Sequence, residues 1–280
     1  MEIEFKNVSY TYDSIEKKEV LKEITTKIIK EKINIILGPS GSGKTTFIEL
    51  INGLLLPSKG KIKVGNFIIG DKKKIKNIKQ LRFDVGLVFQ FPEEQFFKET
   101  VKKEIAFGME YFKYKLNVLD KRIIDSLKMV GLDESYLNCN PLELSDGEKR
   151  KVAIASILVF NPKVLILDEP TVGLDNKSRK DLVRLILRLK KHHKKTVIIV
   201  SHDLDVLYPI GDNYIVLSEG KLLKNGNREE VFKNIRLLKK HNIVVPKIVE
   251  FINRVKEKKD IKLGDEDNTR DLMKAIYRNV

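Results

Sequence analysis

The chain has few of the features that mark secreted, cysteine-rich or membrane-spanning proteins. Its only cysteine is Cys139, which excludes an intrachain disulfide and a cysteine-rich metal site and fits a reducing compartment. The longest apolar runs, such as residues 164–167 and 197–200, have the length of a strand and fall far short of the roughly 18 residues of a membrane span. Charged residues at positions 2–6 leave no apolar segment typical of a secretory signal. We therefore expect a chain that does not cross a bilayer by itself.

The chain does have length and positive charge. Its 280 residues can bury a substantial core, as one large α/β domain with additions or as two small domains. The net charge of +15 predicts attraction to an anionic partner: nucleic acid, acidic lipid headgroups or a nucleotide. Lysines spread over solvated faces explain the same charge equally well. Charge alone therefore does not select a partner.

Residues 33–46, with the sequence INIILGPSGSGKTT, combine three signals in order. Mostly apolar, β-branched residues predict a buried strand, glycines then predict a loop, and an amphipathic run begins a helix. Such a loop binds phosphate, because glycines let backbone N–H groups turn inward and the first helical turn adds unpaired N–H groups. Lys44 adds a mobile positive charge, and the hydroxyl of Thr45 suits Mg²⁺. The expected nucleotide-binding residues are Gly38, Pro39, Ser40, Gly41, Ser42, Gly43, Lys44, Thr45 and Thr46.

Polar side chains also stand at the ends of other expected strands. The apolar run Val164–Leu167 is followed by two carboxylates, Asp168 and Glu169, at the strand end where open α/β sheets bind ligands. Neighbouring residues point in different directions, so Asp168 can face a metal ion while Glu169 faces an attacking water. Gln90 and His202 follow two more apolar runs. A lone histidine is more often structural, but four polar features at four strand ends favour one catalytic site.

The periodicity of the first 90 residues predicts an antiparallel sheet. Alternating polar and apolar residues favour strands at 2–8, 20–29 and 61–69. A helix at about 45–53 interrupts them. The charge run at 72–79 is expected to be a solvated loop or the exposed face of a helix.

Beyond this region the period changes twice. Residues 92–160 have helical periodicity and are expected to form a helical insertion. Strand periods return at 164–168 and 196–201, with a helix at about 176–191 between them, which predicts a right-handed parallel crossover. A hairpin is expected around Glu219-Gly220.

The C-terminal part is expected to be helical and basic. A helix should follow Pro246, and a short last helix is expected at 272–276. The sequence shows no repeat of 20–50 residues and no second glycine-lysine loop.

Six motifs follow one another along the chain: Gly38–Thr46, Gln90, Leu144–Glu148, Val164–Glu169, Leu174-Asp175 and His202. Their order resembles that in the nucleotide-binding subunit of ABC transporters. The resemblance covers residues 1 to about 225 and implies a P-loop NTPase, with a RecA-like parallel sheet, an antiparallel β subdomain and a helical subdomain at about 92–160. Residues 226–280 would be a C-terminal extension with a possible role in dimerisation. The ligands implied are ATP and Mg²⁺.

The resemblance also assigns a role to each motif. In the phosphate loop, Lys44 and Thr45 would be the Walker A residues. Asp168 would hold the metal, with Thr45 and the Q-loop residue Gln90, and Glu169 would be the general base. Further residues implied are Tyr12, which would stack on adenine, Ser145 and Gly147 of the signature, the D-loop residue Asp175, and the switch histidine His202.

A narrower resemblance is to the ATPases of energy-coupling factor (ECF) transporters. It rests on residues 91–97, FPEEQFF, on the segment 100–108 and on the C-terminal tail. It implies an ATPase that drives uptake of a vitamin or a transition-metal ion from the cytoplasmic face of the membrane. The implied partners are a second ATPase subunit, a transmembrane coupling subunit and a substrate-capture subunit. Two interpretations of Glu93 and Glu94 stay open: they receive an arginine from a transmembrane coupling subunit, or they are simply exposed to solvent.

The signature departs from the usual L-S-G-G-Q. Asp146 stands where a glycine is expected, and Glu148 replaces the glutamine. Two carboxylates near a phosphate are unfavourable unless they point away, so the half-site that this signature completes is expected to be weak. This asymmetry favours a heterodimer with a different ATPase chain over a homodimer.

Two other functions fit some of these observations. A soluble ABC ATPase acting on nucleic acid or the ribosome would suit the positive charge, although the chain has neither a long coiled-coil insertion nor a second ATPase unit. A regulatory module without turnover is disfavoured by Glu169 and His202. The solute is beyond reach, because in ECF systems a separate membrane component captures it.

Overall fold

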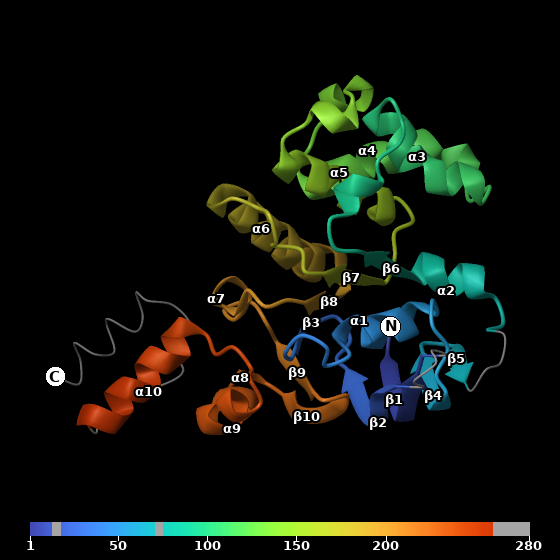
Figure 1. Ribbon diagram of the computed structural model, residues 1–280. Helices are drawn as coiled ribbons and strands as arrows, with labels where there is room; N and C mark the ends of the chain where they lie inside the picture. The colour runs from blue at the N-terminus through green and yellow to red at the C-terminus, as the bar shows by residue number, and fades with distance from the viewer. Residues whose placement is uncertain (13–17, 71–74, 260–280) are drawn as a thin grey trace.

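The computed structural model describes residues 1–12, 18–70 and 75–259 and contains two β-sheets with helices packed around them (Figure 1). The antiparallel sheet has the strand order β2-β1-β4-β5. The larger sheet has the order β10-β9-β3-β8-β7-β6, and all its strands are parallel except β10 at the edge. The strands are β1 Ile3–Thr11, β2 Glu19–Ile28, β3 Ile33–Leu37, β4 Lys59–Val64, β5 Phe67–Gly70, β6 Val85–Val88, β7 Val164–Asp168, β8 Thr196–Val200, β9 Asn213–Ser218 and β10 Lys221–Gly226.

Successive residues of the parallel strands pack on opposite faces of the larger sheet. Strands covered on both faces are apolar throughout, and their side chains still alternate. In β7, Leu165 and Leu167 face the helical core, whereas Ile166 faces the core shared with the antiparallel sheet. On that second side the ring of Phe5 stacks on Phe47, with centroids 4.2 Å apart. The helix that carries Phe47 is therefore held between the two sheets.

Two groups of helices lie on opposite sides of the molecule. In Figure 1, α3, α4 and α5 lie together above the larger sheet, and α8, α9 and α10 lie on the other side of the molecule. The helices are α1 Lys44–Asn52, α2 Ile78–Asp84, α3 Val101–Tyr111, α4 Leu119–Val130, α5 Asp146–Leu158, α6 Asn176–His193, α7 Leu204–Leu207, α8 Arg228–Phe232, α9 Ile235–Lys240 and α10 Lys247–Lys259. Short 3₁₀ turns are η1 Pro92–Gln95, η2 Leu116–Val118, η3 Glu134–Asn138 and η4 Pro141–Glu143.

The fold class expected from the sequence is confirmed, and some boundaries differ. The strand expected at 61–69 is wrong as a single element, because a turn at Gly65 divides it into β4 and β5. β6 ends at Val88, so Gln90 lies in the loop beyond it. α2 begins within the charge run expected at 72–79 and continues beyond it to Asp84, which was not expected. Residues 72–74 of that run lie outside the described residues.

The C-terminal helices pack onto the core of the larger sheet. Phe232 of α8 makes edge contacts with the rings of Tyr208 and Tyr214, and Leu238 of α9 is fully buried. The helix expected after Pro246 is present as α10, whereas the one expected at 272–276 lies outside the described residues. Within residues 1–12, 18–70 and 75–259, the helices are too short or too polar to cross a membrane.

Candidate nucleotide-binding site

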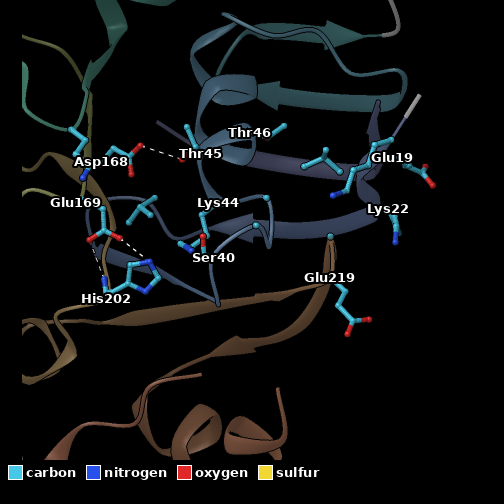
Figure 2. A pocket seen from close by; sticks show the side chains of 17 residues that line it. Glu19, Lys22, Ser40, Lys44, Thr45, Thr46, Asp168, Glu169, His202 and Glu219 are labelled. Carbon is cyan, nitrogen blue, oxygen red and sulfur yellow. Dashed lines mark hydrogen bonds and ion pairs between the residues drawn. The ribbon is translucent and has the colours of Figure 1, made fainter. Parts of the chain in front are cut away.

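A cavity of about 720 Å³ opens at the carboxyl ends of the parallel strands (Figure 2). This volume lies in the range that holds a small-molecule ligand or cofactor. Residues of the phosphate loop meet in it with residues at the ends of β6, β7, β8 and β9. Its lining consists of Lys18, Glu19, Val20, Lys22, Ser40, Gly41, Gly43, Lys44, Thr45, Thr46, Gln90, Asp168, Glu169, Val200, His202, Glu219 and Gly220.

The phosphate loop connects β3 to α1, as the sequence predicts. Gly38 begins it with φ 155°, and a Cβ atom there would lie 2.3 Å from the carbonyl oxygen of Leu217. Only glycine fits this close approach. Gly43 at the N-terminus of α1 makes no side-chain cap hydrogen bond, so the first-turn N–H groups are open to an anion. This end of the loop fits a phosphate group.

Lys44 folds back onto its own loop. Its ammonium group donates to the carbonyl oxygens of Gly38, at 2.8 Å, and Pro39, at 2.9 Å. Burial lowers the pKa of Lys44, and the negative charges of Glu169 and Asp168 oppose that shift. The ammonium group is thus held beside the loop where a phosphate would bind.

Thr45 and Asp168 meet across the cavity from two different elements. The Thr45 hydroxyl donates to Asp168 Oδ2 at 3.4 Å (Figure 2). Burial, and then the neighbouring Glu169 carboxylate, raise the pKa of Asp168. Hydroxyl and carboxylate oxygens are the hard ligands that Mg²⁺ prefers, and Mg²⁺ usually takes only one or two from the protein. The described residues contain no cluster of three or more His, Cys, Asp or Glu that would hold a metal. The Thr45–Asp168 pair supplies the one or two protein ligands that are usual for Mg²⁺.

Glu169 and His202 are joined by two contacts. The backbone N–H of His202 donates to Glu169 Oε2 at 3.1 Å, and His202 Nε2 lies 3.2 Å from Oε1. The Glu169 backbone has φ 45°, a conformation that is uncommon outside glycine and clusters at functional sites. It is fixed by the Glu169 N–H, which donates to the carbonyl oxygen of Val200 at 2.8 Å. The carboxylate is therefore held at the end of β7 and faces the cavity.

The remaining expected site residues lie outside the cavity lining. Tyr12 is partly exposed, and its hydroxyl lies 3.1 Å from Thr46 Oγ1. The Ser145 side chain caps α5, and the Asp175 side chain caps α6 by accepting from the N–H of Ser178 at 2.7 Å.

The two helix starts at Ser145 and Asp175 pack together. A Cβ atom at Gly147 would lie 2.4 Å from Ser178 Oγ, so the first turn of α5 sits directly against that of α6. The expected site residues thus lie in two places. One group lines the cavity, and the other group lies where α5 and α6 begin.

Sequence patterns missed one wall of the cavity. Residues 18–22 and the turn Glu219-Gly220 form it, and Figure 2 shows Glu19, Lys22 and Glu219 across from Asp168, Glu169 and His202. The N–H of Lys22 donates to the carbonyl oxygen of Gly220 at 2.8 Å. Neither segment carries a recognisable motif. The two segments come together only through this long-range contact between the two sheets, which a sequence pattern does not show.

Glu93 and Glu94, the two acidic residues after Gln90, differ in their surroundings. Glu93 is largely buried and accepts from the Arg150 guanidinium at 2.9 Å, so it already has a cationic partner within this chain. Arg150 also donates to the carbonyl oxygens of Pro170 and Val172. Glu94 remains exposed.

A phosphate loop between a parallel strand and a helix, with carboxylates at the end of another parallel strand of the same sheet, defines a P-loop nucleotide-binding protein. Residues 21–172 match the family model described as ABC transporter. The chain belongs to this family and, within it, to the ATP-binding proteins of energy-coupling factor transporters, as its relatives establish.

The curated relatives match over nearly the whole chain. The energy-coupling factor transporter ATP-binding protein EcfA2 of Spiroplasma kunkelii is 44% identical over 261 residues, which cover 92% of this chain and 86% of the relative. EcfA2 of Mycoplasma capricolum is 43% identical and covers 90% of this chain and 88% of the relative.

Two solved structures have the same fold. The cbiO1 subunit from Clostridium perfringens, part of the ABC transporter complex cbiONQ, has a TM-score of 0.75 and 34% identity, covering 90% of this chain and 98% of that subunit. An ATP-binding cassette solved as a dimer in a post-hydrolysis state with ADP and Pi has a TM-score of 0.70 and 31% identity, covering 81% and 98%.

Proposed function

We propose that this chain binds and hydrolyses MgATP as the ATPase subunit of an ECF-type importer. The observation that carries the proposal is the single cavity that brings together the phosphate loop, the Thr45–Asp168 pair and the Glu169–His202 pair. The three groups come from the loop before α1, from α1 itself and from the ends of β7 and β8. Hydrolysis of a bound triphosphate would use all three. Family membership supports the same activity.

The phosphate loop and the Thr45–Asp168 pair would bind the nucleotide and its metal ion. The open N–H groups of the α1 start and the Lys44 ammonium group would hold the phosphates. Thr45 and Asp168 would hold Mg²⁺ together with Gln90, and the ion would neutralise charge on the phosphate oxygens. Tyr12 would pack against the adenine, because its hydroxyl contact with Thr46 places it next to the loop.

Glu169 would act as the general base in hydrolysis. Its carboxylate would accept a proton from the attacking water, and His202 would hold the carboxylate in position through the two contacts between them. Gln90 lines the same cavity and would respond to the nucleotide. Positioning and charge stabilisation account for most of the rate in phosphoryl transfer to water.

Completion of the site would require a second ATPase chain. Ser145, Gly147 and Asp175 lie outside the cavity lining and form a separate surface at the starts of α5 and α6. In a head-to-tail pair, this surface would cover the nucleotide of the partner, and the partner would cover that of this chain. A related cassette that was solved as a dimer supports this arrangement.

The pair would act at the cytoplasmic face of the membrane, through a transmembrane coupling subunit and a substrate-capture subunit. The solute would be a micronutrient, a vitamin or a transition-metal ion. The names of the relatives support transport rather than action on nucleic acid.

Phosphate release from MgATP tests the proposal directly. We expect Mg²⁺-dependent hydrolysis by the chain assembled with its co-purified partners, and loss of ATP binding in Lys44→Ala. Lys61→Ala, on the exposed face of β4, is the matched control and should leave both unchanged. MgATP binding by the purified chain that survives Lys44→Ala would contradict the proposal. Salt-sensitive co-purification of RNA or DNA instead of membrane subunits would favour the nucleic-acid function.

A further inference from the structure

The hairpin turn that forms part of one cavity wall projects beyond the strand that supports it. Pairing of β9 with β3 ends where Val216 pairs with Leu37, whereas β9 continues to Ser218. Beyond that point β9 runs on as one arm of the hairpin with β10, in which Ser218 pairs with Lys221. A two-stranded hairpin is marginally stable by itself. The position of the turn Glu219-Gly220 therefore depends on contacts with other elements.

One such contact comes from β2. The N–H of Lys22 donates to the carbonyl oxygen of Gly220 at 2.8 Å. A Cβ atom at Gly220 would lie 2.3 Å from the carbonyl oxygen of Val20. The turn and residues 18–22 are thus closely packed, and a shift of the turn would change the cavity wall that both form.

A second contact comes from the C-terminal helices. His241 follows α9 directly, and its Nδ1 lies 3.0 Å from Ser218 Oγ at the buried end of β9. The N–H of His241 donates to the carbonyl oxygens of Leu237, at 3.3 Å, and Leu238, at 3.1 Å. The Leu238 side chain is fully buried in the core. The imidazole therefore reaches β9 from a helix end that is itself anchored.

The wall lies on the side of the cavity away from the catalytic carboxylates. Figure 2 shows Glu219 across from Asp168 and Glu169, and Lys44 of the phosphate loop lies between them in this view. A triphosphate whose metal ion is held by Thr45 and Asp168 would extend its nucleoside end toward this wall. The position of the turn would then affect the nucleoside more than the phosphates.

We propose that His241 is a positioning residue for the nucleoside part of ATP. By holding Ser218, it keeps the turn Glu219-Gly220 against residues 18–22. The C-terminal helices thereby set the affinity for ATP from outside the cavity, without touching the nucleotide. This inference rests on the proposed function, because it assumes that the cavity binds MgATP.

Equilibrium binding of two ligands to the purified full-length chain tests this role. MgATP uses both the phosphate loop and the wall, whereas magnesium tripolyphosphate has no nucleoside and uses the phosphate loop. Ser218→Ala and His241→Ala each remove the contact, and the double variant removes it from both sides. His241→Asn keeps a polar atom near the position of Nδ1. His192→Ala, at an exposed position of α6, is the matched control, and thermal unfolding without ligand shows whether each variant is folded.

We expect Ser218→Ala and His241→Ala each to raise the MgATP dissociation constant by about two- to tenfold, the range that one hydrogen bond can transmit. The double variant should show the same increase as either single variant, because both changes remove one shared contact. His241→Asn should recover part of the affinity, and His192→Ala should bind MgATP as the parent does. Binding of tripolyphosphate should be unchanged in every variant.

Unchanged MgATP affinity in the folded Ser218→Ala and His241→Ala chains would overturn the inference. An equal loss of tripolyphosphate affinity would also overturn it, because Leu217 packs against Gly38 and the effect would then pass through the phosphate loop. If His241→Ala does not fold, Ser218→Ala decides the test, since it removes only a hydroxyl. Absence of MgATP binding by the parent chain would instead refute the proposed function.

Discussion

His202 holds the Glu169 carboxylate by both of its oxygens, through its backbone N–H at 3.1 Å and through Nε2 at 3.2 Å. The two residues lie just beyond the carboxyl ends of β7 and β8, which are neighbouring parallel strands. A water between Glu169 and a bound phosphate would meet a carboxylate that is held by two contacts. This geometry supports the proposal that Glu169 acts as the general base.

Glu169→Gln should abolish turnover while leaving MgATP binding intact, because glutamine keeps the size of the side chain but cannot accept a proton. Loss of a general base lowers rates by about 10²–10⁴-fold. Phosphate release and equilibrium MgATP binding measure the two effects separately. Glu134→Gln, at an exposed ion pair with Lys128, is the control and should keep the parent rate. A Glu169→Gln chain that hydrolyses at that rate would show that the base is another residue.

Thr45→Val should raise the Mg²⁺ concentration needed for half-maximal hydrolysis. Valine has nearly the same shape as threonine but lacks the hydroxyl that meets Asp168. We expect a shift of about tenfold or more, since even outer-shell contacts change metal affinity by about 10–100-fold. Titration of Mg²⁺ at saturating ATP measures it, and chelation of the metal should stop hydrolysis in the parent. Thr25→Val, at an exposed position of β2, should leave the titration unchanged. If Thr45→Val and Thr25→Val need the same Mg²⁺ concentration for half-maximal hydrolysis, Thr45 is not a ligand of the metal.

The sequence predicted those parts of the site that depend on local order. Asp168, Glu169, Gln90 and His202 were found because each follows an apolar run, and parallel strands bring their carboxyl ends to one edge. The phosphate loop was found for the same reason, since its glycines, lysine and threonine are contiguous.

Contacts between segments that are distant in the sequence produce no local sequence pattern, so the sequence does not predict them. The wall formed by residues 18–22 and Gly220 depends on the pairing of β2 with the turn after β9. Glu93 and Arg150 are 57 residues apart and meet only because η1 packs against α5. A charged residue in a turn is usually solvated. The local sequence around Glu93 or Arg150 therefore does not predict that the pair is buried.

Arg150→Met should destabilise the fold more than any surface ion-pair change. It leaves the Glu93 carboxylate buried without its cationic partner, and breaking a buried pair on one side costs about 3–5 kcal/mol of unfolding free energy. Adding Glu93→Gln should recover part of this loss, because the second change removes the unpaired charge. Urea unfolding of the two single variants and the double variant measures the coupling.

Lys103→Met provides the comparison for Arg150→Met. It breaks the exposed pair with Glu99 and should change the unfolding free energy by less than about 1 kcal/mol. Equal effects of Lys103→Met and Arg150→Met would mean that the Glu93–Arg150 pair is not held in a buried setting.

Asp168 should limit the stability of the nucleotide-free protein at neutral pH. Its pKa is raised by burial and by the Glu169 charge, so the folded state binds this proton more tightly than the unfolded chain does. The unfolding free energy therefore falls as pH rises from the ordinary aspartate pKa of about 3.9 through the raised value. Above that window the whole penalty for the charged form is present.

Asp168→Asn removes this penalty and should stabilise the nucleotide-free chain at pH 7 by on the order of 1 kcal/mol, while weakening Mg²⁺-dependent hydrolysis. The gain should shrink as pH falls toward 4, where Asp168 in the parent becomes protonated. Thermal unfolding of both proteins across this pH range without nucleotide measures the gain. Asp181→Asn, next to an exposed arginine and a lysine, should give no stabilisation at neutral pH. A parent that is at least as stable as Asp168→Asn at pH 7 would mean that Lys44 and Thr45 already compensate the buried charge.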